Sequence, residues 1–161
     1  MEGFSEDKYI ICQDYFKDYP YRTVQSSRNG CGWIAAYNLR LALGQDVYFD
    51  DVRAEMDEMH KFRVPGPTVM PVMRKYLKKY VINFRETSGK ANVITAMKYA
   101  RAGIIRYYEE GIPHFVTFVR QPGGQFRFFN VNDGMEDFCA TVPDFASAHF
   151  KRGSYSVFTV N

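Results

Sequence analysis

The sequence has few cysteines, and their positions suit neither a cross-linked fold nor a metal-bound one. Only three are present, Cys12, Cys31 and Cys139, at wide and unrelated spacings, and no Cys-x-x-Cys pair occurs. Disulfide frameworks need an even set of cysteines, and structural zinc sites need closely spaced pairs. We therefore expect no disulfides and no metal, which fits a reducing, intracellular setting.

Long hydrophobic runs and a large excess of one charge are also missing. No segment approaches the ~18 apolar residues that a membrane span needs, and the N-terminus lacks the basic and apolar regions of a secretory signal. The formal net charge is +3, and the densest basic cluster reads as the solvated face of a helix: Arg74, Lys75, Lys78 and Lys79. We expect a cytoplasmic protein with no membrane span and no nucleic-acid partner.

The composition that is present is typical of one globular domain. The chain has 161 residues, of which 46% are hydrophobic and 17% aromatic. A chain of this size can bury roughly 68–70% of its unfolded surface, so it can build a core without disulfides. We find no internal repeat and no low-complexity stretch, and we predict a single domain over residues 1–161.

Helical patterns occupy the first two thirds of the sequence. From Cys31 to Leu43, apolar side chains recur at intervals of three and four residues, and Gly44 supplies a stop after the last of them. The same reasoning predicts helices over about 49–61, 68–80 and 91–102. The segment from Ser26 to Gly30 reads as a turn.

The last third is rich in strand-forming residues. Predicted strands cover 104–108, 113–120, 126–132 and 155–160, with shorter ones at 8–16 and 81–85 and a loop over about 133–153. Helices first and antiparallel strands afterwards indicate an α+β fold, with N-terminal helices packed on a C-terminal antiparallel sheet. Such an arrangement leaves a cleft between the helical layer and the sheet.

Cys31 is the cysteine whose surroundings suit a nucleophile. It follows the Asn29-Gly30 turn and stands in the first turn of a predicted helix, where the partial positive charge of the helix N-terminus stabilises a thiolate. We therefore expect the pKa of Cys31 to lie below the free-thiol value of ~8.5. Gly32 leaves the approach to the sulfur open, whereas Cys12 and Cys139 read as structural.

His114 is the candidate base, because it can share a face of the sheet with an orienting amide. It begins the strand predicted over 113–120, and the five-residue connection 121–125 pairs even-numbered residues with even-numbered ones. Asn130 or Asn132 then lies opposite His114 or one diagonal step away. A side-chain amide there could hold the imidazole in the useful tautomer, which is the third role in a catalytic triad.

Gln25 is the candidate donor for the negative charge that develops on an attacked carbonyl oxygen. Such oxyanion sites often combine a backbone N–H with a side-chain amide. The N–H of Cys31 has no intrahelical partner at the helix start. Gln25 stands six residues upstream, across the turn, and its amide could reach the same point.

The order Gln25, Cys31, His114, Asn130 resembles that of the papain-like cysteine peptidases. The run from Asn29 to Leu39, NGCGWIAAYNL, is most similar to a smaller branch, the peptidase domains of bacteriocin-exporting transporters and their stand-alone relatives. That branch usually has Asp-Pro at the third catalytic position, where this chain reads Asn130 followed by valine.

The resemblance implies a papain-like fold that needs no cofactor and acts on a peptide or protein, with leader-peptide processing after small residues such as Gly-Gly. It implies that Cys31 is the nucleophile and His114 the base. It also implies that Asn130, or alternatively Asn132, orients the base, and that Gln25 donates to the oxyanion.

Two other classes of function stay open. Thiol acyltransferases share the order Cys, His, Asp, and an acceptor amine should speed their turnover but leave a hydrolase unchanged. A catalytically silent binding module could keep the same fold, and it would resist a thiol-directed affinity reagent. We favour hydrolysis of a peptide or amide bond through a Cys-His-Asn triad and an acyl-thioenzyme, because the six-residue spacing of Gln25 and Cys31 is the peptidase arrangement. The oligomeric state cannot be inferred from this sequence.

Overall fold

The helices and strands follow one another in the order expected of an α+β chain. The structure, a computed structural model, describes residues 1–62, 64–131 and 137–161. The helices are α1 (Ser26–Asn29), α2 (Cys31–Ala42), α3 (Phe49–Met59), α4 (Met70–Tyr80), α5 (Lys90–Tyr99) and α6 (Val142–His149), with short 3-10 turns at Gln13–Tyr15 and Pro122–Gly124. The strands are β1 (Pro20–Tyr21), β2 (Val24–Gln25), β3 (Arg85–Ser88), β4 (Ala102–Glu109), β5 (Ile112–Arg120), β6 (Phe126–Phe129), β7 (Asp137–Ala140) and β8 (Ser156–Val160).

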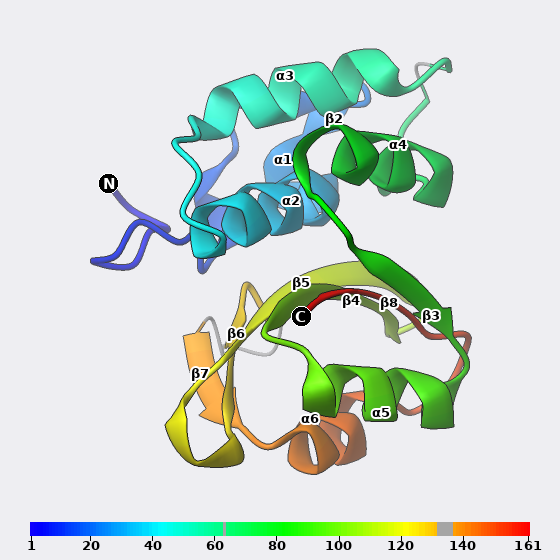
Figure 1. The fold of residues 1–161 in the computed structure, drawn as a ribbon. Coiled ribbons are helices and arrows are strands. Elements are labelled where there is room, and N and C mark those ends of the chain that lie inside the picture. Colours follow the sequence, from blue (N-terminus) through cyan, green and yellow to red (C-terminus); the bar gives the residue numbers. More distant parts are fainter. Residues whose placement is uncertain (63, 132–136) are drawn as a thin grey trace.

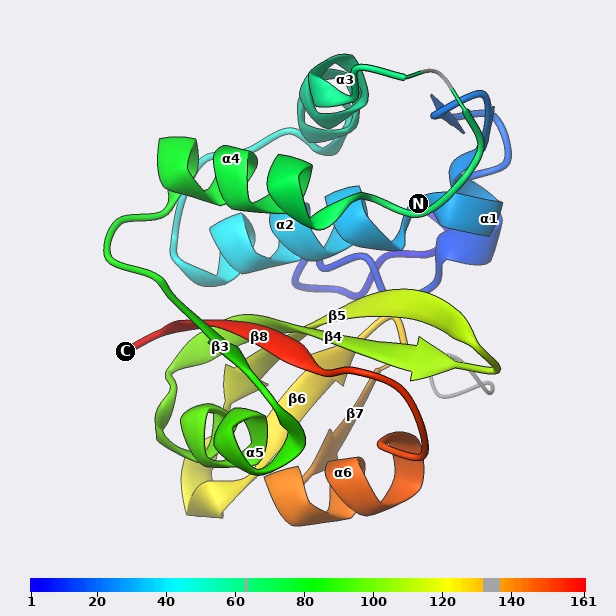
Figure 2. The same cartoon turned by 90° about the vertical axis from the view of Figure 1, so that its right-hand side faces the viewer.

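A central sheet separates two helical layers. Helices α1 to α4 lie on one side of the sheet and α5 and α6 on the other, as Figures 1 and 2 show from perpendicular directions. The sheet is antiparallel throughout, in the order β3-β8-β4-β5-β6-β7, and β1 and β2 form a separate small ribbon. The predicted packing of N-terminal helices on an antiparallel sheet is confirmed, and the second helical layer is an addition that the sequence analysis did not foresee.

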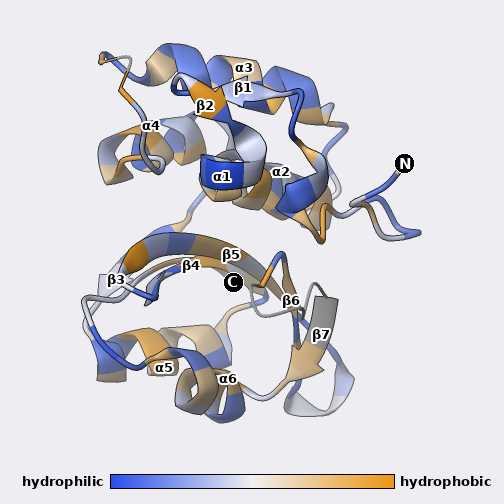
Figure 3. Ribbon diagram, turned by 180° about the vertical axis from the view of Figure 1, so that it is seen from behind, coloured by the Kyte–Doolittle hydropathy of each residue, from blue (hydrophilic) through white to orange (hydrophobic). Residues whose placement is uncertain are grey.

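Strand β5 contributes to both hydrophobic cores, because its side chains alternate between the two faces of the sheet. Phe115 packs in the core under α2, while Val116 and Phe118 belong to the core under α5 and α6. Thr117 also faces α2, and its hydroxyl donates a 2.7 Å hydrogen bond to the carbonyl of Ala35. Figure 3 shows hydrophobic residues along the central strands and hydrophilic ones on α1 and much of α3. Helix α2 is therefore fixed firmly against β5.

Four of the predicted segments differ from the structure, three of them in the first half of the chain or near its middle. The strand predicted at 81–85 is wrong, because Val81 caps α4 through a 2.7 Å bond to Leu77 and β3 begins only at Arg85. The strand predicted at 8–16 is wrong as well; a single bridge between Phe4 and Ile10 precedes a 3-10 turn. The turn predicted at 26–30 is the one-turn helix α1.

The loop predicted over 133–153 is also wrong from residue 137 to residue 149, where the structure has β7 and α6. Helix α6 has a recognisable start: the Thr141 hydroxyl accepts a 3.2 Å bond from the N–H of Asp144, and Pro143 lies in the first turn. Both are standard signals of a helix N-terminus. The apolar residues that follow are too few for the periodicity to stand out.

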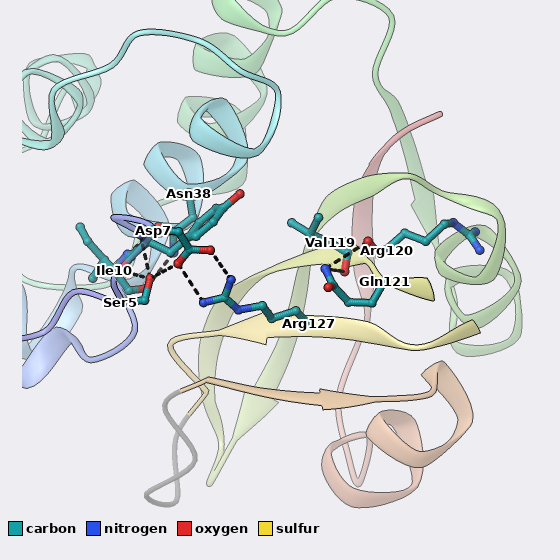
Figure 4. A network of polar contacts seen from close by, with 9 residues as sticks. Ser5, Asp7, Ile10, Asn38, Val119, Arg120, Gln121 and Arg127 are labelled. Atoms are coloured by element: carbon teal, nitrogen blue, oxygen red, sulfur yellow. Dashed lines mark hydrogen bonds and ion pairs between the residues drawn. The ribbon is translucent and has the colours of Figure 1, made fainter. Parts of the chain in front are cut away.

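The N-terminal segment is tied to both the helical layer and the sheet. Asn38 of α2 accepts a 2.8 Å bond from the N–H of Ile10 and donates a 2.9 Å bond to its carbonyl, as a neighbouring strand would. The carboxylate of Asp7 pairs with Arg127 of β6 at 2.5 and 3.1 Å (Figure 4). Hydrogen bonding to Arg127 lowers the pKa of Asp7 to about 2. These contacts fix the path of the chain just before Gln13.

In the described ranges, the structure contains no helix that is long and apolar enough to cross a membrane. Over the same residues, no three His, Cys, Asp or Glu side chains are grouped in a way that could hold a metal ion.

Candidate active site

A cavity of about 610 Å³ lies where the start of α2 meets the start of β5. Residues from five parts of the chain line it: Gln13, Val24, the segment Arg28 to Cys31, the loop Pro65 to Pro67, and the turn from Glu109 to His114. Two of the predicted catalytic residues, Cys31 and His114, therefore share one cavity although 83 positions separate them.

Cys31 is the first residue of α2, and the start of this helix is wedged against the loop before α4. A Cβ atom on Gly32 would lie 2.0 Å from the hydroxyl oxygen of Thr68, so only glycine fits beside the nucleophile. Thr68 is itself held by a 2.7 Å hydrogen bond with the hydroxyl of Tyr21. Gly32 thus allows close packing behind Cys31, whereas the sequence analysis assigned it the role of opening the approach to the sulfur.

The Cys31 thiol is 4% exposed, and this burial controls its acidity. Burial raises the pKa of Cys31 to about 11, because a thiolate loses the solvation of water there. Hydrogen bonds from the backbone N–H groups of Phe115, Gly32 and Cys31 itself have the opposite effect and lower the pKa of the thiol, but less strongly than burial raises it. The expectation of a lowered pKa is therefore wrong: the helix start favours the thiolate, and burial outweighs it.

His114 is also 4% exposed, and its ring is held by the chain that follows β6. Its Nε2 lies 2.9 Å from the carbonyl oxygen of Asn130, and Tyr107 packs edge-on against the ring at 5.7 Å between centroids. A carbonyl oxygen only accepts hydrogen bonds, so Nε2 carries the proton and Nδ1 has the free lone pair in the neutral ring. Burial lowers the pKa of His114 to about 4, against the opposing effect of the Asn130 bond.

Cys31 and His114 reach the cavity from different sides of the sheet. His114 lies on the face of β5 that carries Val116, and Cys31 approaches the same strand from the α2 side. Within the described residues no hydrogen bond joins the Cys31 sulfur to the imidazole. With the pKa of the thiol raised and that of the ring lowered, the resting pair is a neutral thiol and a neutral imidazole.

The side chain of Asn130 does not contact His114. Its Oδ1 accepts a 2.9 Å bond from the N–H of Gln13, and its Nδ2 donates a 2.9 Å bond to Gln13 Oε1. The backbone of Asn130 has a φ of +62°, in the left-handed region that asparagine tolerates better than most residues. The expected contact between a side-chain amide and the imidazole is therefore corrected to a contact of the main-chain carbonyl.

The register of the sheet agrees with the predicted parity, since Thr117 pairs with Phe129 and Phe118 with Phe128. Asn132, the alternative third residue, lies outside the described residues. Strand β6 ends at Phe129, so Asn130 stands just beyond the ladder, where its backbone is free to turn.

The glutamine that lines the cavity is Gln13, and not Gln25 as the sequence suggested. Gln25 is exposed at the N-cap of α1 and does not line the cavity, and no hydrogen bond of its side chain is found among the described residues. Gln13 does line the cavity, and its Nε2 donates a 3.1 Å bond to the carbonyl of Ser27. No motif in the sequence points to Gln13, because its partners are distant along the chain.

This arrangement of helices and strands is also found in a protein of known structure. The chain is similar to the crystal structure of the peptidase domain of Streptococcus ComA, a bi-functional ABC transporter involved in a quorum sensing pathway. The TM-score is 0.55 at 13% sequence identity, and the match covers 83% of this chain and 93% of that one. The chain has the papain-like fold of the ComA peptidase domain.

This fold was predicted from the resemblance of the sequence to exporter-associated peptidases, and at the level of the fold the prediction is confirmed. The sequence matches no protein-family model and no curated protein. The likeness to ComA therefore concerns the course of the chain, and the chemistry has to be argued from the residues of the cavity.

Proposed function

We propose that the protein is a cysteine peptidase that hydrolyses a peptide bond through Cys31 and His114. The observation that carries this proposal is the shared cavity, which is lined both by a cysteine at a helix start and by a histidine whose Nε2 already donates to a carbonyl. The likeness of the fold to a peptidase domain supports the same reading. A peptide or protein is the proposed substrate class, with leader processing as the narrower form.

In the proposed reaction His114 acts as a general base, because the resting pair is neutral. As the Cys31 sulfur attacks the carbonyl carbon, its proton passes to Nδ1 of His114 and the carbonyl oxygen gains negative charge. The carbon–nitrogen bond then breaks, the amine leaves with the proton from His114, and a thioester remains on Cys31. Water attacks this thioester, giving its proton to His114, and the acid and the free thiol are released.

The N–H of Cys31 and the amide of Gln25 are the proposed donors to the oxyanion. Cys31 N–H is at the first position of α2, where an N–H has no intrahelical acceptor. Gln25 stands at the N-cap of α1, and no described hydrogen bond holds its amide elsewhere, so the side chain is free to turn toward a bound substrate. Its role as an oxyanion donor stays a prediction.

The proposed activity is tested by digesting a peptide library with the purified protein and mapping the cleaved bonds by mass spectrometry. Cleavage that is abolished in both Cys31→Ala and His114→Gln supports a Cys-His peptidase. Cleavage that persists in Cys31→Ala comes from another site or a contaminant and refutes the assignment. A trapped thioester on Cys31, stable in acid and removed by hydroxylamine, would identify the covalent step.

A silent binding module is the second candidate, and the burial of Cys31 favours it. A thiol that is 4% exposed with a raised pKa is a poor nucleophile until a substrate changes its surroundings. A peptide carrying a thiol-reactive electrophile at its C-terminus separates the two candidates. A peptidase is labelled at Cys31 faster than at the exposed Cys139, whereas a binding module shows the reverse order.

A further inference from the structure

Asn130 and Gln13 hold each other through a closed pair of hydrogen bonds. The N–H of Gln13 donates to Asn130 Oδ1 and the amide of Asn130 donates to Gln13 Oε1, each at 2.9 Å. We infer that the main-chain carbonyl of Asn130 orients His114, and that Gln13 is the positioning residue that keeps this carbonyl aimed at the ring. The inference rests on the proposed function, because it assigns roles within the same site.

The conformation of Asn130 explains why it needs the two hydrogen bonds to Gln13, which we call the clasp. The direction of a carbonyl depends on the backbone angles of its own residue, and at Asn130 the φ of +62° turns the carbonyl to within 2.9 Å of His114 Nε2. Residues other than glycine leave this left-handed region readily, although asparagine less so than most. If Asn130 relaxed to a negative φ, the acceptor would swing away from the ring. The two bonds to Gln13 oppose that relaxation.

Gln13 also reaches the nucleophile's side of the cavity. Its Nε2 donates a 3.1 Å bond to the carbonyl of Ser27, four residues before Cys31, and the N–H of Ser27 donates to Phe16 at 3.2 Å. One side chain therefore joins the support of the base to the turn that leads into α2. The carboxamide of Gln13 supplies both the acceptor and the donor that these two contacts require.

The position of Gln13 is itself fixed from outside the site. Three residues earlier, Ile10 is bonded on both its N–H and its carbonyl to the buried side chain of Asn38. The pair of Asp7 and Arg127 ties the same segment to β6, the strand that leads to Asn130 (Figure 4). The clasp thus joins two pieces of chain that are already held in register.

The test compares Asn130→Ala, Asn130→Gly, Gln13→Ala and the double variant Gln13→Ala/Asn130→Gly with the natural protein. The matched control is Gln121→Ala, since among the described residues the side-chain amide of Gln121 bonds to the carbonyls of Val119 and Arg120, outside the cavity. The first measurement is the ring ¹⁵N chemical shifts of His114, assigned by their loss in His114→Gln, which report the tautomer without any turnover. The second is kcat and KM on the best-cleaved peptide of the library digest.

We expect the His114 ring to carry its proton on Nε2 both in the natural protein and in Gln121→Ala. Asn130→Ala should give mixed tautomers and a kcat lower by about 10²-fold, the size expected when a reacting group is misplaced. Asn130→Gly should keep the tautomer, because glycine adopts a positive φ without strain, and should recover about tenfold of the lost kcat. Gln13→Ala should mix the tautomers and lower kcat with KM unchanged, and should add nothing to Asn130→Gly.

Several results would overturn the inference. Equal losses of tautomer and kcat in Asn130→Gly and Asn130→Ala would assign the orienting role to the side-chain amide. A Gln13→Ala variant with an unchanged tautomer would remove the positioning role. A further loss of kcat from Gln13→Ala in the Asn130→Gly background would show that Gln13 acts mainly through another contact, such as its bond to the Ser27 carbonyl, and not by holding Asn130. If the tautomers follow the expected order while no peptide is cleaved, the peptidase proposal fails and the positioning role stands.

Discussion

The burial of His114 makes the stability of the fold sensitive to acid. Its pKa falls from 6.5 to about 4 on folding, so between these values the unfolded chain binds a proton that the folded chain does not. The contribution of the neutral His114 side chain to the free energy of unfolding is then fully present above pH 6.5 and is lost as the pH falls toward 4. At about 1.4 kcal/mol for each pH unit, the loss for this one side chain comes to about 3 kcal/mol, a large part of the stability of a small domain.

His114→Gln isolates this contribution, because glutamine does not titrate and its amide can still donate to the Asn130 carbonyl. The comparison is needed since burial also lowers the pKa of His60, which destabilises both proteins as the pH falls below 6.5. Urea unfolding at pH 7, 6, 5 and 4 can be followed by the fluorescence of Trp33, the sole tryptophan and fully buried. The stability advantage of the natural protein over the variant should shrink by about 3 kcal/mol from pH 7 to pH 4. A constant difference across these pH values would show that His114 is not buried in its neutral form.

Three further predictions concern the other residues of the site. Because the pKa of Cys31 is raised to about 11, its alkylation by iodoacetamide in the free protein should be slower than that of exposed Cys139 at pH 7.5 and should keep rising up to pH 11; a plateau near pH 7 would contradict this. Gly32→Ala should lower the free energy of urea unfolding by about 1–3 kcal/mol, since its Cβ would overlap Thr68, and Thr68→Ser should not relieve the strain because the clashing hydroxyl remains. Gln25→Ala should reduce turnover by about 10²–10³-fold while leaving Cys31 alkylation unchanged, and full turnover in that variant would leave the oxyanion to the Cys31 N–H and other donors.

The sequence was a good guide to features that depend on neighbouring residues. The helix from Cys31 and the strand from Pro113 to Arg120 follow from local periodicity, and the parity of the β5–β6 pairing follows from the length of the connecting turn. The placement of Cys31 at a helix start beside a cavity shared with His114 could therefore be predicted.

What the sequence could not provide depends on contacts between distant residues. The φ of Asn130 is stabilised by Gln13, 117 positions away, so no local pattern shows that the carbonyl of Asn130 rather than its amide faces His114. The acidity of Cys31 was misjudged for a similar reason. The effect of a helix start can be read from adjacent residues, whereas burial depends on the whole packing of α2 against β5.

The position of β8 has a consequence for the order in which the protein is made. This strand, Ser156–Val160, lies between β3 and β4, and β3 has no other strand beside it in the described sheet. While the chain is growing on a ribosome, β4 therefore has an unpaired edge until residue 160 has emerged, even though Cys31 and His114 were synthesised long before. Strand β4 pairs with β5 from Ala102 to Glu109, so the strand that carries His114 belongs to a sheet that is incomplete until β8 has been added. A growing chain would thus carry Cys31 and His114 before the sheet beside them is complete, and under the proposed function we expect cleavage only after β8 has been added.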